Sequence, residues 1–221
     1  MESLFATPSL DHITSEDYLK IYEPDQDSFL FLDSLEKEFE TIQHIDPYMI
    51  VEIGPGSGII STFLTRIVNA QHPTCTLAID INEDACRVTK ETYKENHIAY
   101  GEAIHGNLLQ GTLERLRNKV DVLLFNPPYV PTESDEVFRP SIESAYAGGV
   151  KGREVIDVLL PDVHKILSNK GVFYLLLEKA NVPEEVTAIL ERTGLKGSTI
   201  LRKKLMGEEL MVMKYMRCSS T

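Results

Sequence analysis

The chain has 221 residues, of which 43% are hydrophobic and 25% are charged, as expected of one soluble globular domain with a sizeable core. No apolar run approaches the ~20 residues that cross a bilayer, and the N-terminus lacks the layout of a signal peptide, so we expect a cytoplasmic location, with the nucleus also accessible. The formal net charge of −12 disfavours direct nucleic-acid binding, and we interpret the small basic cluster of Arg202, Lys203 and Lys204 as a solvated strand end.

The three cysteines, Cys75, Cys86 and Cys218, match neither a disulfide framework nor a metal site. With an odd count and no C-x-x-C spacing, a reducing compartment is the simpler interpretation. We expect all three to be structural, because buried free cysteines behave as small hydrophobic residues, and we expect no bound metal.

The N-terminal part of the chain is expected to lie outside the folded core. Residues 1–20 are polar and unpatterned and predict a tail or cover, whereas residues 21–221 form the folded domain. Apolar residues recur at helical spacing from Ser28 to Ile42 and predict one amphipathic helix, which ends before Asp46-Pro47. The nearly continuous apolar run 49–53 then predicts a strand buried on both faces.

Strands and helices alternate through the rest of the chain. Further apolar runs predict strands at 76–81, 98–105, 120–125 and 171–177. Helical spacing predicts helices at 60–67, 85–92, 155–167 with a kink at Pro161, and 186–190 closed by Gly194. Residues 130–152 carry proline, glycine and charge without periodicity, which predicts a long loop.

The last two predicted strands, 198–204 and 208–215, are joined through Met206-Gly207. This connection is too short for a parallel crossover, so the two strands should form an antiparallel hairpin. The whole pattern predicts an α/β fold: a doubly wound, mostly parallel seven-stranded sheet with a C-terminal antiparallel hairpin. In such sheets ligands bind beyond the carboxyl ends of the strands, near the point where the strand order reverses.

A glycine loop follows the first strand, with the sequence Glu52-Ile53-Gly54-Pro55-Gly56-Ser57-Gly58. The dinucleotide fingerprint G-x-G-x-x-G would place its third glycine at position 59, which is an isoleucine. Glu52 would oppose a pyrophosphate but suits a cationic ligand, such as the ammonium and sulfonium of S-adenosylmethionine. Asp80, at the end of the second strand, can accept both ribose hydroxyls. The alternative is a cluster of turn glycines with a helix-capping aspartate.

The tetrapeptide Asn126-Pro127-Pro128-Tyr129 follows the fourth strand and should lie at the same edge of the sheet. A planar amide or exocyclic amine is a weak nucleophile, which an enzyme assists by accepting hydrogen bonds from both N–H groups and aiming the nitrogen. The Asn126 side-chain oxygen and the Pro127 carbonyl are suitable acceptors, and the Tyr129 ring can pack on the planar group. The alternative is a proline turn that closes the strand.

These motifs resemble those of the HemK-type class I methyltransferases, which have a Rossmann-like fold, and in particular their short eukaryotic and archaeal branch. The resemblance covers nearly the whole chain. It rests on the segment 22–28, Glu52–Gly58, Asp80, the Asn-Pro-Pro-Tyr motif, Ala147-Gly148-Gly149 and Gly152-Arg153-Glu154. It implies methyl transfer from S-adenosylmethionine, which leaves S-adenosylhomocysteine, to the glutamine side-chain amide of the Gly-Gly-Gln motif in class 1 translation release factors.

The resemblance also implies roles for particular residues. Lining of the cofactor pocket is implied for Ser28, Glu52, Gly54, Gly56, Gly58, Asp80, Asn107, Leu108 and Asn126. Asn126, Pro127 and Tyr129 would bind the substrate amide and carry catalysis. Asn107 departs from the family's usual Asp near the adenine ring, and we expect the change to be tolerated, because Asn also accepts hydrogen bonds.

The resemblance further implies a heterodimer with a small zinc-binding activator subunit, which would add to an edge strand around 98–104. Two other interpretations stay open: a methyltransferase for adenine amino groups or another acceptor, and a non-catalytic scaffold that binds S-adenosylmethionine. The residues that recognise a substrate protein are expected in the loop 130–152 and in the acidic N-terminal tail. Glu133, Asp135, Glu136 and Arg153 are available there, although solvated surface is the simpler role for most of them.

Overall fold

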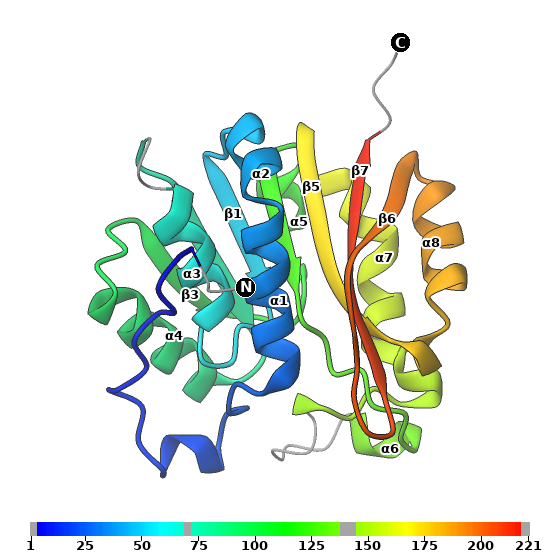
Figure 1. Ribbon diagram of the computed structural model, residues 1–221, viewed down its shortest axis with the longest axis horizontal. Helices are drawn as coiled ribbons and strands as arrows, with labels where there is room; N and C mark the ends of the chain where they lie inside the picture. Colours follow the sequence, from blue (N-terminus) through cyan, green and yellow to red (C-terminus); the bar gives the residue numbers. More distant parts are fainter. Residues whose placement is uncertain (1–3, 69–71, 138–144, 218–221) are drawn as a thin grey trace.

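The computed structural model describes residues 4–68, 72–137 and 145–217, and its centre is one seven-stranded sheet (Figure 1). The strands are β1 (Met49–Ile53), β2 (Cys75–Asp80), β3 (Gly101–His105), β4 (Val120–Phe125), β5 (Leu167–Glu178), β6 (Leu195–Lys204) and β7 (Glu209–Arg217). Their order across the sheet is β3-β2-β1-β4-β5-β7-β6. Neighbours from β3 to β5 are parallel, whereas β7 runs antiparallel to both β5 and β6. The predicted doubly wound sheet with a C-terminal hairpin is confirmed.

Helices cover both faces of this sheet. They are α1 (Gln26–Lys37), α2 (Phe39–Ile45), α3 (Ile59–Val68), α4 (Glu83–Glu95), α5 (Leu113–Leu116), α6 (Ser134–Val137), α7 (Glu154–Ile166) and α8 (Pro183–Glu191), with 3-10 turns η1 (Asp17–Leu19), η3 (Val150–Gly152) and η4 (Lys179–Asn181). Ile50 packs in the hydrophobic cluster of α1 to α3, while the next residue, Val51, packs in the opposite cluster with α7 and α8. The central strands are therefore buried on both faces, which explains their nearly continuous apolar sequences.

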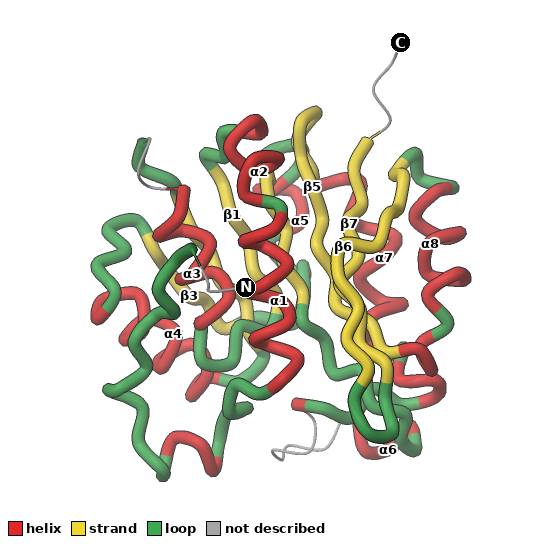
Figure 2. Tube along the Cα trace, viewed as in Figure 1, coloured by secondary structure: helices red, strands yellow, loops and turns green. Residues whose placement is uncertain are grey.

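The direction of winding reverses between β1 and β4. The chain builds outward from β1 through β2 to β3, then returns to place β4 on the other side of β1. In the parallel pairing of β1 with β4, Ile53 lies opposite Phe125. The glycine loop after β1 and the Asn-Pro-Pro-Tyr motif after β4 consequently leave the sheet side by side, at the end where Figure 2 shows loops gathered near α6 and the β6–β7 turn.

The helix predicted to run without interruption from Ser28 is in fact two helices, α1 and α2, which meet at Glu38. Glu38 leaves the helical conformation, with φ −88° and ψ 4°. Its buried carboxylate accepts hydrogen bonds from Lys214 Nζ at 2.7 Å and from the Tyr174 hydroxyl at 3.1 Å. The prediction of one helix was wrong because apolar residues keep their spacing across the break, while the cause of the break is a tertiary contact.

Two other boundaries also differ from the prediction. The third strand begins at Gly101 and not at residue 98, because His97 turns with φ 60° and Ile98 packs with Tyr93 beneath the sheet edge. Residues 130–152 are not a structureless loop in their described part: they contain α6, η3 and a parallel bridge from Val130 to Ala147. In contrast, α7 continues as one helix through Pro161.

Residues 4–20, expected to be a tail or cover, lie along the surface of α3 and α4 (Figure 1). Ser9 and Asn96 exchange two hydrogen bonds of 2.9 and 2.8 Å. Asp17 pairs with Arg87 of α4 at 2.5 Å. The segment is thereby tied to the helix that flanks the end of β2.

Two of the three cysteines lie in the part of the chain that the structure describes, and both are free thiols. Cys86 is buried and Cys75 is exposed, while Cys218 lies outside the described residues. Burial raises the pKa of the Cys86 thiol to about 11, which keeps it protonated and poorly reactive. Within the described ranges, no helix has the length and apolar content needed to cross a membrane.

Candidate active site

Three glycines of the loop have backbone conformations with positive φ, which residues with a side chain rarely adopt. Gly54, Gly56 and Gly58 have φ values of 62°, 55° and 77°. The Gly54 amide donates to the Ile79 carbonyl at 2.9 Å, which ties the loop to the end of β2. A Cβ on Gly58 would lie 2.9 Å from the Thr89 Cγ2 atom of α4. Gly58 is thus needed for close packing of α3 against α4, whereas Gly54 and Gly56 face the pocket.

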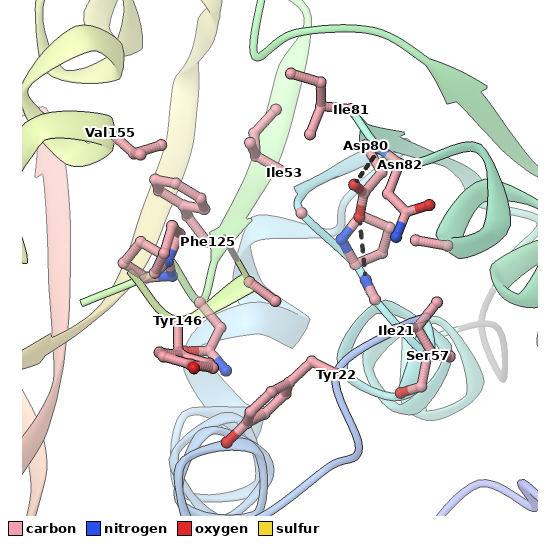
Figure 3. Close-up of a pocket in the computed structure, with 18 of the residues that line it drawn as sticks. Ile21, Tyr22, Ile53, Ser57, Asp80, Ile81, Asn82, Phe125, Tyr146 and Val155 are labelled. Carbon is pink, nitrogen blue, oxygen red and sulfur yellow. Dashed lines mark hydrogen bonds between the residues drawn. The ribbon is translucent and has the colours of Figure 1, made fainter. Parts of the chain in front are cut away.

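Asp80 ends β2 with its carboxylate fixed at the rim of this loop (Figure 3). One carboxylate oxygen accepts from the Gly56 amide at 3.3 Å, and the other accepts from the Asn82 amide at 2.9 Å. Burial raises the pKa of Asp80, while the two backbone amides act in the opposite direction. The result is a rigid acceptor group at the carboxyl end of the sheet, suited to a pair of ligand hydroxyls.

Glu52 lies behind the glycine loop and is 1% exposed. Its Oε2 atom accepts from the Ser61 amide at 3.1 Å and so satisfies one free N–H in the first turn of α3. Its Oε1 atom is buried and has no hydrogen-bond partner. Burial, with a smaller contribution from Asp80, raises the pKa of Glu52 to about 8. A cation bound nearby would favour the ionised form of this carboxyl group.

Asn126, the first residue after β4, has its side chain oriented by α1. Its Nδ2 atom donates to Asp27 Oδ2 at 2.8 Å. Asp27 is 3% exposed and also accepts hydrogen bonds from the Tyr22 hydroxyl at 3.2 Å and the Ser28 hydroxyl at 3.4 Å. The Asn126 Oδ1 atom is buried and has no hydrogen-bond partner. The amide therefore offers one unused acceptor beside the pocket.

The residues after Asn126 are anchored through their backbone. Pro127 is buried, and the Tyr129 carbonyl accepts a 2.8 Å hydrogen bond from Asn181 Nδ2. Asn181 is completely buried and also donates to the Lys151 carbonyl at 2.9 Å. Burial raises the pKa of the Tyr129 hydroxyl far above its usual range, so the ring stays neutral. The motif is held in place by a residue more than fifty positions away in the sequence.

These elements enclose a pocket of about 730 Å³, within the usual range for small-molecule and cofactor sites. Figure 3 shows Asp80, Ile81 and Asn82 on one side of it, with Phe125 and Tyr146 on the other. Asn107 and Leu108, which follow β3, also line the pocket. In the described part of the chain, no group of three or more His, Cys, Asp or Glu side chains is arranged to hold a metal ion.

Comparison with known proteins adds to this geometry. Residues 21–146 match the family model described as "Methyltransferase small domain". The human protein Methyltransferase HEMK2 is 40% identical over 211 residues, which cover 96% of each chain. The chain belongs to the methyltransferase small domain family. Within it, the chain is a HemK-type methyltransferase of the eukaryotic and archaeal branch.

Two further similarities support this membership. The mtq2 catalytic subunit of the eRF1 methyltransferase from Schizosaccharomyces pombe is 34% identical to this methyltransferase, covering 99% of this chain and 98% of that one. A solved structure, the E. cuniculi Mtq2–Trm112 complex that methylates the eRF1 translation termination factor, is also similar. It matches with a TM-score of 0.65 and 28% identity, and covers 90% of this chain and 99% of that chain.

The structure of this methyltransferase brings most of the residues predicted for the site into one pocket. Its lining includes Ser28, Gly54, Gly56, Asp80, Asn107, Leu108, Asn126, Pro127 and Tyr129. Glu52 and Gly58 do not line it: the former lies behind the loop, and the latter packs on Thr89. Their part in cofactor binding would be indirect, through the shape and electrostatics of the loop.

Several residues of the pocket were not predicted from the sequence. Asp27 stands in the segment 22–28 on which the family resemblance rests, but nothing in the sequence shows that it contacts Asn126. Ile21 and Tyr22 come from the end of the N-terminal segment, and Tyr146 comes from the loop after α6. Only tertiary structure brings these side chains to the carboxyl ends of β1 and β4.

Arg153 was predicted to be available for substrate recognition, and this prediction was wrong. It is 5% exposed and forms ion pairs with Asp157 at 2.8 Å and Glu185 at 2.5 Å. Its guanidinium group joins the start of α7 to α8. Glu133 is exposed, whereas the side chains of Asp135 and Glu136 lie outside the described residues.

Proposed function

We propose that this methyltransferase transfers a methyl group to the side-chain amide nitrogen of the glutamine in the Gly-Gly-Gln motif of a class 1 translation release factor. S-adenosylmethionine is the methyl donor, and S-adenosylhomocysteine is the product. One observation carries the proposal: the buried Asn126 Oδ1 atom lacks a partner while the other half of the same amide is already engaged. The relatives named as eRF1 methyltransferases support the choice of acceptor.

S-adenosylmethionine supplies an electrophilic methyl group on its sulfonium when bound. The glycine loop and Asp80 would hold it, with the Asp80 carboxylate accepting hydrogen bonds from ribose hydroxyls. The end of β3, with Asn107 and the left-handed Leu108 at φ 50°, would border the adenine ring. The side-chain amide of Asn107 retains both hydrogen-bonding roles there.

The acceptor half of the site follows from Asn126 and Pro127. A glutamine amide has two N–H groups, and the Asn126 Oδ1 atom and the Pro127 carbonyl would each accept one of them. Preorganised acceptors cost no reorganisation during the reaction and stabilise the positive charge that develops on the nitrogen. The Tyr129 ring packs against the planar amide. The nitrogen then loses a proton to solvent, because a methylated amide cation is strongly acidic.

We further propose that a small zinc-binding activator subunit binds this chain at β3. This strand is one edge of the sheet. The Ala103 amide donates at 3.0 Å to the Glu102 carboxylate, a local side-chain contact that a carbonyl of an added strand would replace. Replacement Ala103→Pro removes this donor and should abolish co-purification with the activator. Retention of the complex by Ala103→Pro would exclude docking along this edge.

We also propose a cytoplasmic or nuclear location for this methyltransferase, and a fluorescent fusion would test it. The acceptor is tested with labelled S-adenosylmethionine. We expect transfer to the release factor and no transfer when its motif glutamine is replaced by alanine.

Asn126→Ala should abolish transfer while cofactor binding stays measurable. Transfer to oligonucleotides instead would favour an adenine acceptor, although the net charge of −12 opposes nucleic acid. Absence of transfer to any acceptor would favour a scaffold.

A further inference from the structure

The hydrogen bond between α1 and the Asn126 side chain joins a carboxylate to the group expected to hold the substrate. Asp27 and Asn126 are 99 positions apart in the sequence, and the donor and acceptor atoms are 2.8 Å apart. Asp27 is 3% exposed, and burial of a carboxylate is costly unless hydrogen bonds compensate for it. The Tyr22 and Ser28 hydroxyls supply two more hydrogen bonds to Asp27 Oδ1. The carboxylate is therefore rigidly placed.

We propose that Asp27 is a positioning residue that fixes the Asn126 amide with its oxygen toward the substrate nitrogen. The inference rests on the proposed function, since it assumes an acceptor with N–H groups. An ionised carboxylate only accepts hydrogen bonds, so the Nδ2 end of Asn126 must face Asp27. The opposite orientation would bring two oxygens together and present an NH₂ group to the substrate NH₂ group.

Orientation matters here because the two ends of an amide have nearly the same shape. Without a fixed partner, the Asn126 side chain would exchange its oxygen and nitrogen by a rotation that costs little. A charge-assisted hydrogen bond is about twice as strong as a neutral one and selects one orientation. The buried Oδ1 atom, which has no partner in the described structure, is the end that this selection leaves for the substrate.

The first test removes the acceptor at position 27. We expect Asp27→Ala to lower kcat about 100-fold, as for other losses of alignment. The KM for the release factor and the Kd for S-adenosylmethionine, measured by calorimetry, should change less than about threefold. Asp27→Asn should recover most of kcat, because its carbonyl can accept the same bond. Asp33→Ala, an exposed position on the same helix, is the matched control.

The second test exchanges the two side chains. Asn126→Asp alone would set two carboxylates against each other across the 2.8 Å contact and should be nearly inactive. The double variant with Asp27→Asn and Asn126→Asp restores one donor and one acceptor, again with a free oxygen toward the substrate. We expect it to be at least tenfold more active than Asn126→Asp, a coupling revealed by the double-mutant cycle.

The outcomes separate this inference from the proposed function. If the wild-type protein transfers no methyl group to the glutamine motif, the proposed function fails. If the wild type is active and Asp27→Ala has the same kcat, or loses cofactor affinity in parallel with kcat, the positioning role of Asp27 is wrong. Absence of any recovery in the exchanged double variant, with its thermal stability retained, would contradict it independently.

Discussion

Gly152 provides a sharp test of how the Asn-Pro-Pro-Tyr motif is held in place. Its φ is +66°, and a Cβ atom there would lie 1.9 Å from the Tyr129 carbonyl oxygen and 2.6 Å from Asn181 Nδ2. Contacts this short are not tolerated, so Gly152→Ala must push the Tyr129 backbone away by roughly 1 Å or more. The same displacement would stretch the hydrogen bond from Asn181 to the Tyr129 carbonyl.

The cost of this substitution has two separable parts. An alanine in the left-handed region loses about 1–2 kcal/mol. Overpacking against Tyr129 and Asn181 adds about 1–3 kcal/mol. The matched control is Gly111→Ala, because Gly111 has φ +74° but a Cβ atom added there would meet no other atom within 4 Å. The control isolates the backbone cost, and the difference between the two variants measures the steric contribution.

Chemical denaturation and single-turnover methyl transfer check these values. We expect Gly152→Ala to reduce the free energy of unfolding by about 2–5 kcal/mol, and Gly111→Ala by about 1–2 kcal/mol. Below both melting temperatures, Gly152→Ala should also lower kcat about 100-fold, because an error of about 1 Å at an acceptor is enough. Equal destabilisation of both variants, or an unchanged kcat in Gly152→Ala, would refute the reasoning.

Two further predictions concern the cofactor half of the site. Asp80→Ala should raise the Kd for S-adenosylmethionine about 10–100-fold by calorimetry, with little change in KM for the release factor, and an unchanged Kd would contradict the assignment of Asp80. Glu52 has its pKa raised by burial to about 8 in the folded protein, against an ordinary value of 4.5, so it binds a proton that the unfolded chain releases between these pH values. Its contribution to stability is therefore present below pH 4.5 and is lost as the pH rises toward 8, by up to about 1.4 kcal/mol per pH unit. Glu52→Gln should flatten the fall in melting temperature of the cofactor-free protein from pH 5.5 to 8, and parallel curves for the two proteins would argue against a buried neutral carboxyl.

The fold was predictable where local pattern and tertiary structure agree. The strands β1 and β4 begin and end where their apolar runs predict, because both are buried on two faces between polar or turn-forming residues. The break at Glu38 was not predictable, because Phe39 and Ile42 continue the helical spacing beyond it. Its cause, the hydrogen bonds to Lys214 and Tyr174, comes from residues that are adjacent only in the folded protein.

The same distinction applies to the candidate site. Gly54, Asp80 and Asn126 were found from sequence because each directly follows or ends a strand, and the carboxyl ends of parallel strands share one edge. The contacts of Asp27 with Asn126 and of Asn181 with Tyr129 span 99 and 52 positions, and no local pattern marks them. Arg153 was misjudged for a related reason, since its ion pair with Glu185 of α8 and its burial arise only in the folded protein.

The site therefore consists of two halves that are held by different contacts, and this division has a measurable consequence. The cofactor half is carried by the ends of β1, β2 and β3, which strand register holds together. The acceptor half is carried by β4 but oriented by two buried side chains from elsewhere, Asp27 in α1 and Asn181 in η4. The two halves meet in the β1–β4 pairing and in the hydrogen bond from Ser28 to Asp27, but the contacts that fix Asp80 are separate from those of Asp27 and Asn181 with the acceptor half. Changes at Asp80 should therefore act on cofactor affinity, and changes at Asp27 or Asn181 on kcat. Variants taken from the two halves should then combine additively, whereas Asp27 and Asn126 should not.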